Sequence, residues 1–329
     1  MKILVTGGAG YIGSHVCKAL ARNGFKPVVY DNLSRGNRWA VKWGPLEEGD
    51  ILDEVRLREV FAFHQPGAIM HFAAYAYIGE SVEKPHLYYQ NNIVGSTTLL
   101  RTTARWRVPV VFSSTCATYG IPERIPITEN HPQRPINPYG YSKLAVENML
   151  KDMEGEHQSR SVILRYFNAA GADPEGEIGE AHDPEPHLIP RILAAAQNDS
   201  VVRVYGDNYD TPDGTCVRDY VHVTDLAEAH VLALKTLQNN SNPKSLNLGT
   251  GKGFSVREVI QTARLVTGRT IAVREGPRRP GDPPQLVADA TRAKNELGWK
   301  PRYGDLKQVI ATAWNWNARE LTQRPQNAI

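Results

Sequence analysis

The chain has 329 residues, of which 41% are hydrophobic and 22% are charged, and its formal net charge is +3. This length is enough for one large or two moderate domains with full cores, and the small charge argues against nucleic acid or a membrane surface as a partner. Cys17, Cys116 and Cys216 lack metal-ligand spacing, and the sequence shows neither a signal peptide nor an apolar run of roughly 18 residues, so we expect a cytoplasmic protein without disulfides or a metal site.

The chain opens with an apolar strand that runs into glycines and then into a helical pattern. Gly8, Gly10 and Gly13 fit the spacing G-x-G-x-x-G, and Gly7, Gly10 and Gly13 fit the wider spacing G-x-x-G-x-x-G. Glycines in such a turn let the backbone bend sharply, approach a pyrophosphate and offer N–H groups at the start of a helix. The spacing is weak evidence alone, but it lies between a strand and a helix, so we predict a dinucleotide site here.

A carboxylate follows the second apolar run of the chain. Residues 27–30 end on Asp31, where a carboxylate would accept hydrogen bonds from the ribose hydroxyls of NAD and repel the extra phosphate of NADP. Arg35 and Arg38 lie in the same loop and are counter-evidence, because a basic residue there can bind the 2′-phosphate. We predict NAD as the cofactor, with NADP as the alternative.

Further apolar runs alternate with stretches of helical length. The strands predicted next are 68–72, 108–112 and 161–165, and the helices include 88–106 and 141–153. This alternation predicts an α/β fold with a Rossmann-type, doubly wound parallel sheet, in which ligands bind beyond the carboxyl ends of the strands. Small or polar residues follow the predicted strands at 7–13, 31–32, 50–51, 73–74, 113–115 and 168–170. Any one of these could be an ordinary loop, but together they predict a site at one edge of the sheet.

Tyr139 and Lys143 stand four residues apart, just after Asn137 and Pro138. On a helix this spacing places both side chains on one face, so an ammonium can lie beside a phenol and favour its ionised form. An unperturbed tyrosine has a pKa of about 10, and such a neighbour could bring it to a value useful for a general base. The alternative is a solvated helix start without a catalytic role.

Several segments together carry a resemblance to a known family. The chain resembles the extended short-chain dehydrogenase/reductases in six segments, which are residues 6–13, 31–34, 71–74, 112–115, 137–143 and 165–168. Within them it is most similar to the UDP-glucose 4-epimerases. The later segments 217–226 and 278–282 resemble motifs of the same family, so the match covers nearly the whole chain.

The resemblance implies a catalytic set of Tyr139, Lys143 and Thr115. Ionised Tyr139 would remove the proton of the sugar's 4-hydroxyl while the C4 hydride passes to the nicotinamide of NAD. Thr115 would hydrogen-bond the same oxygen, and Lys143 would hold the nicotinamide ribose and keep the tyrosine pKa low. The 4-keto sugar would then rotate, and the returning hydride would invert C4. NAD is therefore expected to stay bound and to end the cycle unchanged.

By the same resemblance, two sets of residues surround the cofactor and the UDP-sugar. Besides Tyr139 and Lys143, the cofactor set is Gly7, Gly10, Tyr11, Ile12, Gly13, Asp31, Asn32, Asp50, Ile51, Phe72, Ala73, Ala74, Asn91, Ser113 and Tyr166. Besides Thr115 and Tyr139, the substrate set is Asn168, His187, Leu188, Arg218, Tyr220, Arg279, Asp282 and Leu286. We therefore predict that residues 1–170 form an NAD-binding domain, to which a segment at about 217–240 returns. Residues 171–329 would mainly form a smaller, mixed α/β domain that binds the UDP-sugar.

Some positions depart from the family's pattern. His187 stands where many members have asparagine, and segment 73–81 lacks a lysine that is common there, so we expect no cationic contact from it. Leu286 stands where some members have a tyrosine that narrows the pocket against N-acetylated sugars, which makes UDP-N-acetylhexosamines alternative substrates. Segments 72–77 and 114–119 are also similar to epimerases of UDP-xylose and UDP-arabinose, a second alternative.

Other functions fit the sequence less well. The related 4,6-dehydratases have a carboxylate after the catalytic threonine, whereas Cys116 follows Thr115 here, so water elimination would lack its acid and base. A non-catalytic NAD(H) sensor would lack the Tyr-Lys pair, and an oxidoreductase with an exchangeable cofactor is a further alternative. The resemblance also implies a homodimer through helices at 87–107 and 141–154, although their apolar positions could equally cover the sheet of one subunit.

Overall fold

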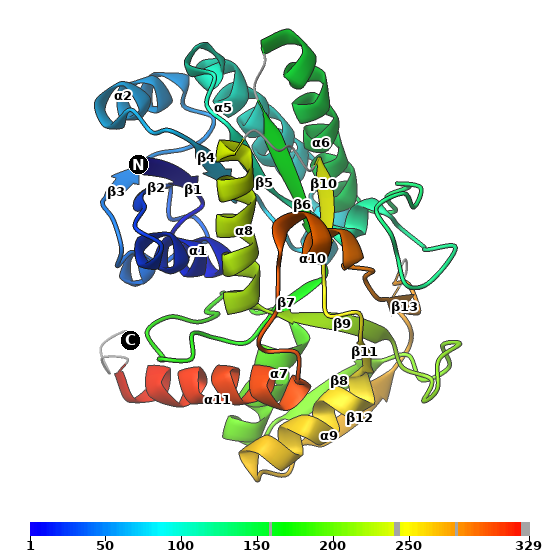
Figure 1. The fold of residues 1–329 in the computed structure, drawn as a ribbon. Helices are drawn as coiled ribbons and strands as arrows, with labels where there is room; N and C mark the ends of the chain where they lie inside the picture. Colours follow the sequence, from blue (N-terminus) through cyan, green and yellow to red (C-terminus); the bar gives the residue numbers. More distant parts are fainter. Residues whose placement is uncertain (158–159, 240–243, 280–281, 324–329) are drawn as a thin grey trace.

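The computed structural model describes residues 1–157, 160–239, 244–279 and 282–323, and a seven-stranded sheet forms the middle of its larger part, the upper one in Figure 1. The sheet is parallel and has the order β10-β6-β5-β4-β1-β2-β3. Its strands are β1 (Lys2–Thr6), β2 (Lys26–Asp31), β3 (Leu46–Glu48), β4 (Ile69–His71), β5 (Val110–Thr115), β6 (Ser161–Tyr166) and β10 (Ser245–Leu248). The strand order reverses between β1 and β4, which is the switch point where doubly wound sheets bind ligands. The predicted fold class is confirmed.

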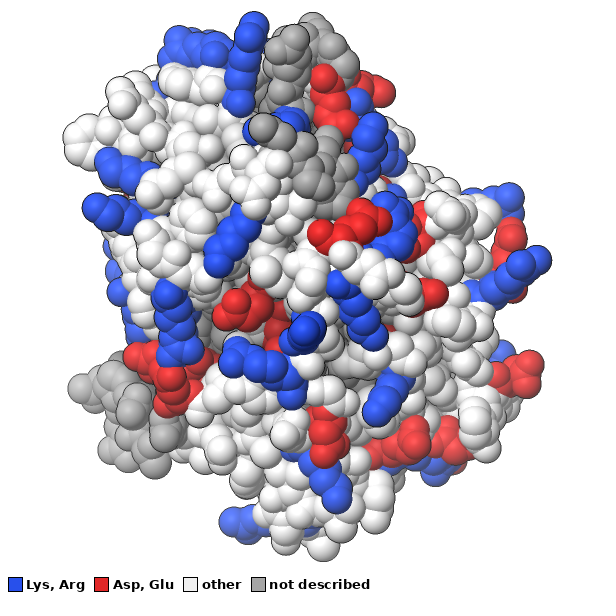
Figure 2. All heavy atoms as spheres, in the orientation of Figure 1, with Lys and Arg blue, Asp and Glu red and all other residues white. Residues whose placement is uncertain are grey.

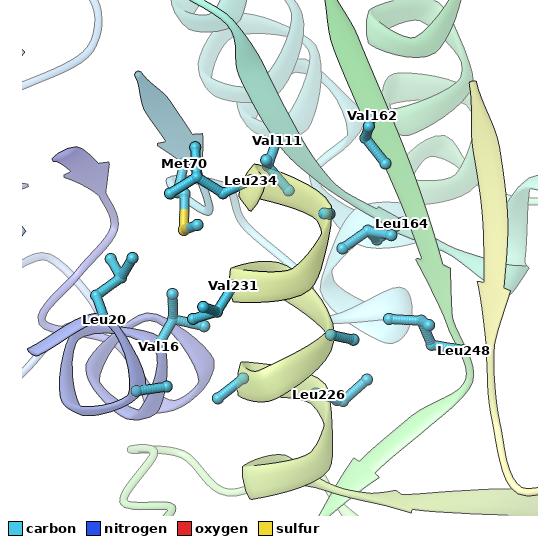
Figure 3. Packing of buried hydrophobic residues seen from close by; sticks show 14 of the residues in the cluster. Val16, Leu20, Met70, Val111, Val162, Leu164, Leu226, Val231, Leu234 and Leu248 are labelled. Atoms are coloured by element: carbon cyan, nitrogen blue, oxygen red, sulfur yellow. The ribbon is translucent and has the colours of Figure 1, made fainter. Parts of the chain in front are cut away.

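Helices cover both faces of this sheet because the side chains of each strand alternate between the two faces. Ile3 and Val5 of β1 join a buried cluster with α1 and α8, including Val16 and Leu226 (Figure 3). Leu4, between them, joins the cluster on the opposite face, against α2, α5 and α6. These helices are α1 (Tyr11–Arg22), α8 (Val223–Gln238), α2 (Glu54–His64), α5 (Ser96–Thr103) and α6 (Pro138–His157).

The segment between β4 and β5 differs from the single helix predicted at 88–106. It consists of α3 (Ile78–Glu83), α4 (Pro85–Tyr88), the π-helix η2 (Tyr89–Gly95), α5 and the 3-10 helix η3 (Ala104–Trp106). The other 3-10 helices are η1 (Arg38–Ala40) and η4 (Cys116–Thr118). Residues 113–115, predicted to follow a strand, are instead part of β5, where they pair with residues 164–166 of β6.

The later part of the chain builds smaller sheets beyond the carboxyl edge of the large one. β9 (Val217–His222) pairs with β7 (Asn168–Ala170), β11 (Gly253–Ser255) and β13 (Gln285–Leu286), while β8 (Val201–Tyr205) pairs with β12 (Ala272–Gly276). A separate buried cluster unites α7 (Leu188–Asn198), α9 (Val256–Thr267) and α11 (Leu306–Gln323). α10 (Thr291–Leu297) packs against α8 and β10.

The segment expected to return to the first domain divides between the two parts. β9 belongs to the smaller sheet, whereas α8 covers the large sheet and β10, which was not predicted, forms its edge. The domain boundary at residue 170 stays a prediction.

Charges of both signs are interspersed on the face that Figure 2 shows. Within the described residues, no helix combines the length and the apolar character needed to cross a membrane.

Candidate functional site

Three glycines form the tight turn between β1 and α1. Gly7 has a φ of +72°, and a Cβ atom there would lie 2.6 Å from the backbone nitrogen of Ala73. A Cβ atom on Gly13 would lie 2.2 Å from the carbonyl oxygen of Gly7, so any larger residue would push the turn and helix apart. Gly10 is the N-cap of α1 and has no side chain to cover the first amides of the helix. The turn therefore presents a helix N-terminus to an anion, which fits the pyrophosphate of a dinucleotide.

Asp31 ends β2 beside this turn and is held by backbone amides. Its carboxylate accepts hydrogen bonds from the N–H groups of Ala9 at 3.0 Å and Leu33 at 2.9 Å. Burial raises the pKa of Asp31, and the two amides act in the opposite direction. The carboxylate thus has a defined position at the end of the second strand, where dinucleotide-binding folds hold the ribose of the adenosine.

The two arginines that could serve a 2′-phosphate are paired with glutamates. Arg35 donates to both carboxylate oxygens of Glu80, at 2.7 and 3.0 Å, and Arg38 forms an ion pair with Glu48. Because each guanidinium already has a carboxylate partner, these contacts favour NAD over NADP.

Arg35 also brings a positive charge to segment 73–81, which itself contains no lysine. Its guanidinium carbon lies 5.5 Å from the ring centroid of Tyr75 and 5.0 Å from that of Tyr77. Cation–π contacts of this kind hold the loop after β2 against the segment after β4. Tertiary packing, rather than the local sequence, therefore decides whether a cation lies here.

The remaining residues of the predicted cofactor set lie near the carboxyl edge of the sheet. Asn32 donates to the carboxylate of Asp50 at 2.8 Å, which links the residues that follow β2 and β3. Asn91 of η2 donates to Asn92 at 2.9 Å. The other members are Tyr11 and Ile12 at the start of α1, the buried Ile51 after β3, and Phe72, Ala73 and Ala74 after β4.

Thr115 and Tyr139 meet where the end of β5 faces the start of α6. The Asn137 side chain accepts a hydrogen bond from the N–H of Gly140 at 2.8 Å and so caps the helix that carries Tyr139. Thr115 is the last residue of β5, and its hydroxyl lies close enough to the Tyr139 phenol to lower the pKa of that phenol. Thr115 and Tyr139, which the resemblance implied as catalytic residues, therefore lie together at the carboxyl edge of the sheet.

The ammonium of Lys143 is buried one turn further along α6. Its Nζ donates to the carbonyl oxygen of Ser113 at 2.9 Å and lies 4.9 Å from the ring centroid of Phe112. The Ser113 hydroxyl accepts a hydrogen bond from the phenol of Tyr166. Ser113 thus connects two members of the predicted cofactor set.

Burial sets the pKa of both predicted catalytic groups in this arrangement. It raises the pKa of Tyr139 to about 12, against the opposing effect of the Thr115 hydroxyl, and it lowers the pKa of Lys143 to about 7, against the opposing carboxylate of Glu147. We expected Lys143 to keep the tyrosine pKa low. In the structure its ammonium donates to the Ser113 carbonyl, and the neighbour that lowers the Tyr139 pKa is the Thr115 hydroxyl, so the effect of Lys143 on the tyrosine stays a prediction.

A buried ion pair adjoins these residues, and we did not expect it from the sequence. Glu147, one turn after Lys143, accepts hydrogen bonds from Arg165 at 2.9 and 2.6 Å and from Ser114 at 2.5 Å. Glu147 is 0% exposed and Arg165 is 2% exposed. The signal available in the sequence was an arginine inside an otherwise apolar strand. Because Ser114 precedes Thr115, the ion pair ties β5, β6 and α6 together next to the site.

Several predicted substrate residues share the smaller four-stranded sheet. Asn168 of β7 is the register partner of Tyr220 on β9, and Leu286 of β13 is the partner of Arg218 on β9. Arg218 donates to Asp282 at 2.5 Å, and its side chain is 12% exposed. This sheet therefore assembles residues from three distant parts of the chain.

Leu286 also lies against the segment that follows β5. It packs on a buried cluster that includes Cys116, the residue after Thr115, and Phe167. Arg279 contacts a different strand, with its guanidinium carbon 4.0 Å from the ring centroid of Tyr205 at the end of β8. Two residues of the predicted motif at 278–282, Pro280 and Gly281, lie outside the described residues.

Leu188 begins α7, and His187, its N-cap, belongs to a cluster that we did not predict. His182 and His187 each form ion pairs with Glu180 and Glu185. Burial alone would lower the pKa of each histidine, but the carboxylates raise it, to about 9 for His182 and about 10 for His187. The spacing Glu-x-His-x-x-Glu-x-His is the sequence signal that could have identified this group.

Comparison with known proteins agrees with this geometry. The model of the NAD dependent epimerase/dehydratase family matches residues 3–249. A UDP-glucose 4-epimerase of Rhizobium meliloti (strain 1021) is 52% identical over 319 residues, which are 96% of this chain and 97% of that protein. The structure of UDP-glucose 4-epimerase from Brucella ovis in complex with NAD is 54% identical, with a TM-score of 0.93 over 95% of this chain and 97% of that one. A UDP-glucose-4-epimerase from Stenotrophomonas maltophila, with bound NAD and formylated UDP-arabinopyranose, is 40% identical, with a TM-score of 0.94 over 99% of this chain and 100% of that one. The chain belongs to the NAD dependent epimerase/dehydratase family.

Proposed function

We propose that this protein is a UDP-glucose 4-epimerase, an NAD-dependent enzyme that interconverts UDP-glucose and UDP-galactose. The observation that carries the proposal is the contact between the Tyr139 phenol and the Thr115 hydroxyl, one turn from the buried Lys143 ammonium. These groups lie at the same edge of the sheet as the open N-terminus of α1. The Rhizobium and Brucella relatives, named as UDP-glucose 4-epimerases, support this reading.

Three features of the chain would hold NAD. The open N-terminus of α1 would bind the pyrophosphate, the Asp31 carboxylate would accept hydrogen bonds from the adenosine ribose, and Lys143 would bind the nicotinamide ribose. When bound, the nicotinamide supplies a centre that can accept a hydride and give it back.

The chain's own residues would move the proton. Tyr139 would take the proton of the sugar's 4-hydroxyl and return it to the same oxygen after the sugar has turned over. Thr115 would hold that oxygen by a hydrogen bond. Because burial raises the pKa of Tyr139 to about 12, removing the proton near neutral pH requires positive charge beside the phenol. Lys143 lies one turn away on the same helix face, and its ammonium would supply this charge by turning from the Ser113 carbonyl toward the phenol.

The smaller sheet would hold the UDP part of the substrate. Arg218 lies on this sheet and Arg279 contacts Tyr205 at the end of β8, and a diphosphate is well matched by planar arginine forks. Asp282 orients the Arg218 guanidinium through their 2.5 Å contact. Asn168, His187, Leu188 and Tyr220 are the further residues that we propose for the nucleotide.

Assay of the purified protein tests the proposal. We expect conversion of UDP-galactose to UDP-glucose without added cofactor, together with NAD released when the protein is denatured. Turnover that depends on added NAD and yields NADH would instead identify a net oxidoreductase. NAD binding without turnover of any UDP-hexose, UDP-N-acetylhexosamine or UDP-pentose would identify a sensor.

Asp31 provides a test of cofactor choice. We expect Asp31→Ser to weaken NAD binding and to relax discrimination against NADP, because the change removes a ribose acceptor and a charge that repels phosphate. Titration of cofactor-stripped protein with NAD and NADP measures both effects. Asp152→Ser, at an exposed position of α6, is the control. An unaltered ratio of the two affinities in Asp31→Ser would show that Asp31 does not contact the ribose.

Leu286 provides a test of sugar choice. We expect the native protein to accept UDP-N-acetylglucosamine, and we expect Leu286→Tyr to lower kcat/KM for it by at least about tenfold while sparing UDP-galactose. A sugar that must turn over needs clearance on both faces, and an added ring would strike an acetamido group before a hydroxyl. Leu286→Met, of similar volume, is the control. An equal change for both sugars would show that Leu286 is not the gate.

Pentose substrates form a second possibility, which the Stenotrophomonas relative with bound formylated UDP-arabinopyranose supports. The same kinetic comparison with UDP-xylose and UDP-arabinose decides between hexose and pentose as the preferred sugar.

For the assembly we propose a homodimer through η2 and α6, which pack against each other. Tyr89 and Val94 of η2 and Tyr141 of α6 are exposed apolar side chains that a second copy could cover. Sedimentation equilibrium of the native protein measures whether its mass is that of two chains.

We also propose a cytoplasmic location, because Cys17, Cys116 and Cys216 are all buried free thiols, as expected in a reducing compartment.

A further inference from the structure

Two histidines and two glutamates direct donor atoms at one point in the loop before α7. One side-chain nitrogen or oxygen from each of Glu180, His182, Glu185 and His187 lies within 4.8 Å of all the others. The Nδ1 atom of His187 is 2.7 Å from Glu180 and 2.8 Å from Glu185. The Nδ1 atom of His182 is 3.1 Å from Glu180 and 3.5 Å from Glu185. Both imidazoles thus turn the same ring nitrogen toward the same two carboxylates.

The backbone that carries this cluster is fixed from both ends of the chain. The indole Nε1 of Trp316 on α11 donates to the carbonyl of Glu180 at 3.1 Å, and the side chain of Asn37 donates to the carbonyl of Ala181 at 3.1 Å. Gly179 lies against the Trp316 ring so closely that a Cβ atom would be 2.3 Å from it. The backbone at the start of the cluster is therefore held by contacts outside it, which favours a preorganised site.

Two aromatic rings border the cluster. The Tyr11 ring lies 6.3 Å from the ring of His182, and the Tyr77 ring lies 5.7 Å from His182 and 6.0 Å from His187. The side chains range from 8% exposed for Glu180 to 41% exposed for His187. Partial burial of the carboxylates strengthens their attraction for a cation.

We propose that Glu180, His182, Glu185 and His187 bind one divalent transition-metal ion, with zinc as the best match. Two imidazole nitrogens and two carboxylate oxygens form a mixed nitrogen and oxygen donor set of four, which suits Zn²⁺ and its neighbours in the first row rather than Mg²⁺ or Ca²⁺. Two carboxylates also neutralise the charge of a divalent ion. The site is new relative to the proposed epimerase reaction. It shares His187 with the residues that we propose for the nucleotide, but the Nδ1 atom that would bind the metal faces Glu180 and Glu185.

A second carboxylate cluster shows why the donor set matters. Asp173, Glu175 and Glu177 also lie close together, but the ammonium of Lys18 is among them, at 2.7, 2.9 and 2.5 Å respectively. That cluster already has a cation and offers oxygen donors alone. It therefore carries no metal proposal and supplies a control from the same loop.

The position of the proposed site suggests a structural role. The loop from residue 171 to 187 connects β7 to α7 and is held by α1 at one point and by α11 at another, through Lys18 and Trp316. A metal ion bound near its end would join residues 180 and 187 and fix the start of α7. A bound metal that does not bind the unfolded chain stabilises the fold by mass action.

Metal analysis of protein made without a polyhistidine tag tests the proposal. The protein is stripped with a chelator, equilibrated with Zn²⁺, passed through a desalting column and analysed by mass spectrometry for zinc. We expect about one zinc per chain in the native protein and in the control Glu177→Gln. We expect His182→Ala and Glu185→Gln to bind at least about 100-fold more weakly in competition with a chromophoric chelator, since even indirect ligand contacts are worth 10-fold to 100-fold.

Cobalt substitution gives a readout that does not depend on the variants. Co²⁺ bound by the native protein should show intense visible absorption of a four-coordinate site, and Zn²⁺ should abolish it. Native protein that retains no zinc after desalting, or zinc binding that is equal in the native protein, His182→Ala and Glu185→Gln, would overturn the proposal. The four residues would then be a cluster of ion pairs between protonated histidines and glutamates.

Discussion

Tyr139→Phe is expected to lower kcat by at least about 100-fold, the contribution typical of a positioned acid or base. The substitution removes one oxygen and leaves the aromatic ring, which lies edge-on to Tyr88 with ring centroids 6.4 Å apart. Packing at the start of α6 should therefore survive, and so should the bound NAD. Steady-state kinetics with UDP-galactose, together with the NAD content of the denatured protein, measures both.

Tyr141→Phe is the matched control for this prediction. Tyr141 lies on the same helix two residues later and is exposed in the single chain, and the change keeps the ring that we propose for the dimer contact, so turnover of this variant should be native. If Tyr139→Phe kept more than half of the native rate under conditions where chemistry limits turnover, the proton-transfer role of Tyr139 would be wrong. Loss of NAD in Tyr139→Phe alone would instead assign the tyrosine to cofactor binding.

Glu147→Ala is expected to reduce the free energy of unfolding by about 3–5 kcal/mol. Glu147 is fully buried and accepts two hydrogen bonds from the guanidinium of Arg165, which is itself only 2% exposed. Removing the carboxylate would leave that positive charge buried beside the Tyr119 hydroxyl and without a counter-ion among the contacts it now makes. Chemical denaturation at neutral pH measures the loss.

The double variant Glu147→Leu with Arg165→Met separates the ion pair from simple packing. Because it removes both charges and retains most of the apolar volume, it should be less destabilised than Glu147→Ala. A double variant that is less stable than Glu147→Ala would show that an unpaired Arg165 charge is not the main cost of removing the carboxylate.

The elements that the sequence predicted best are those whose signal is local. The alternation of apolar strands with helical stretches predicted the parallel sheet, because side chains on a buried strand and on a covering helix repeat with different periods. The glycine spacing at 7–13 predicted the turn because the contact that requires glycine is also local. Gly13 approaches the carbonyl of Gly7, six residues earlier, so closely that no other residue type could make this contact.

Element boundaries were harder to predict where the signal was weaker. Ser113, Ser114 and Thr115 are polar and small, so they were expected to follow a strand, yet they complete the backbone pairing of β5 with β6. Residues 88–106 were predicted as one regular helix, but the π-helix η2 interrupts this stretch. In that turn Asn92 donates to the carbonyl of Tyr75 and to the hydroxyl of Ser142, contacts with segments that the helical period does not encode.

By itself, the sequence determined the fold class, the dinucleotide turn and the i,i+4 spacing of Tyr139 and Lys143. Each of these features depends on residues that are close together in the chain. Only the tertiary structure decided what surrounds these groups. The Lys143 ammonium faces Ser113, thirty positions away in the chain, and Arg165 reaches Glu147 from another element, eighteen positions away. Charge states depend on burial and on such partners, so a spacing that brings two side chains to one face cannot set their pKa values.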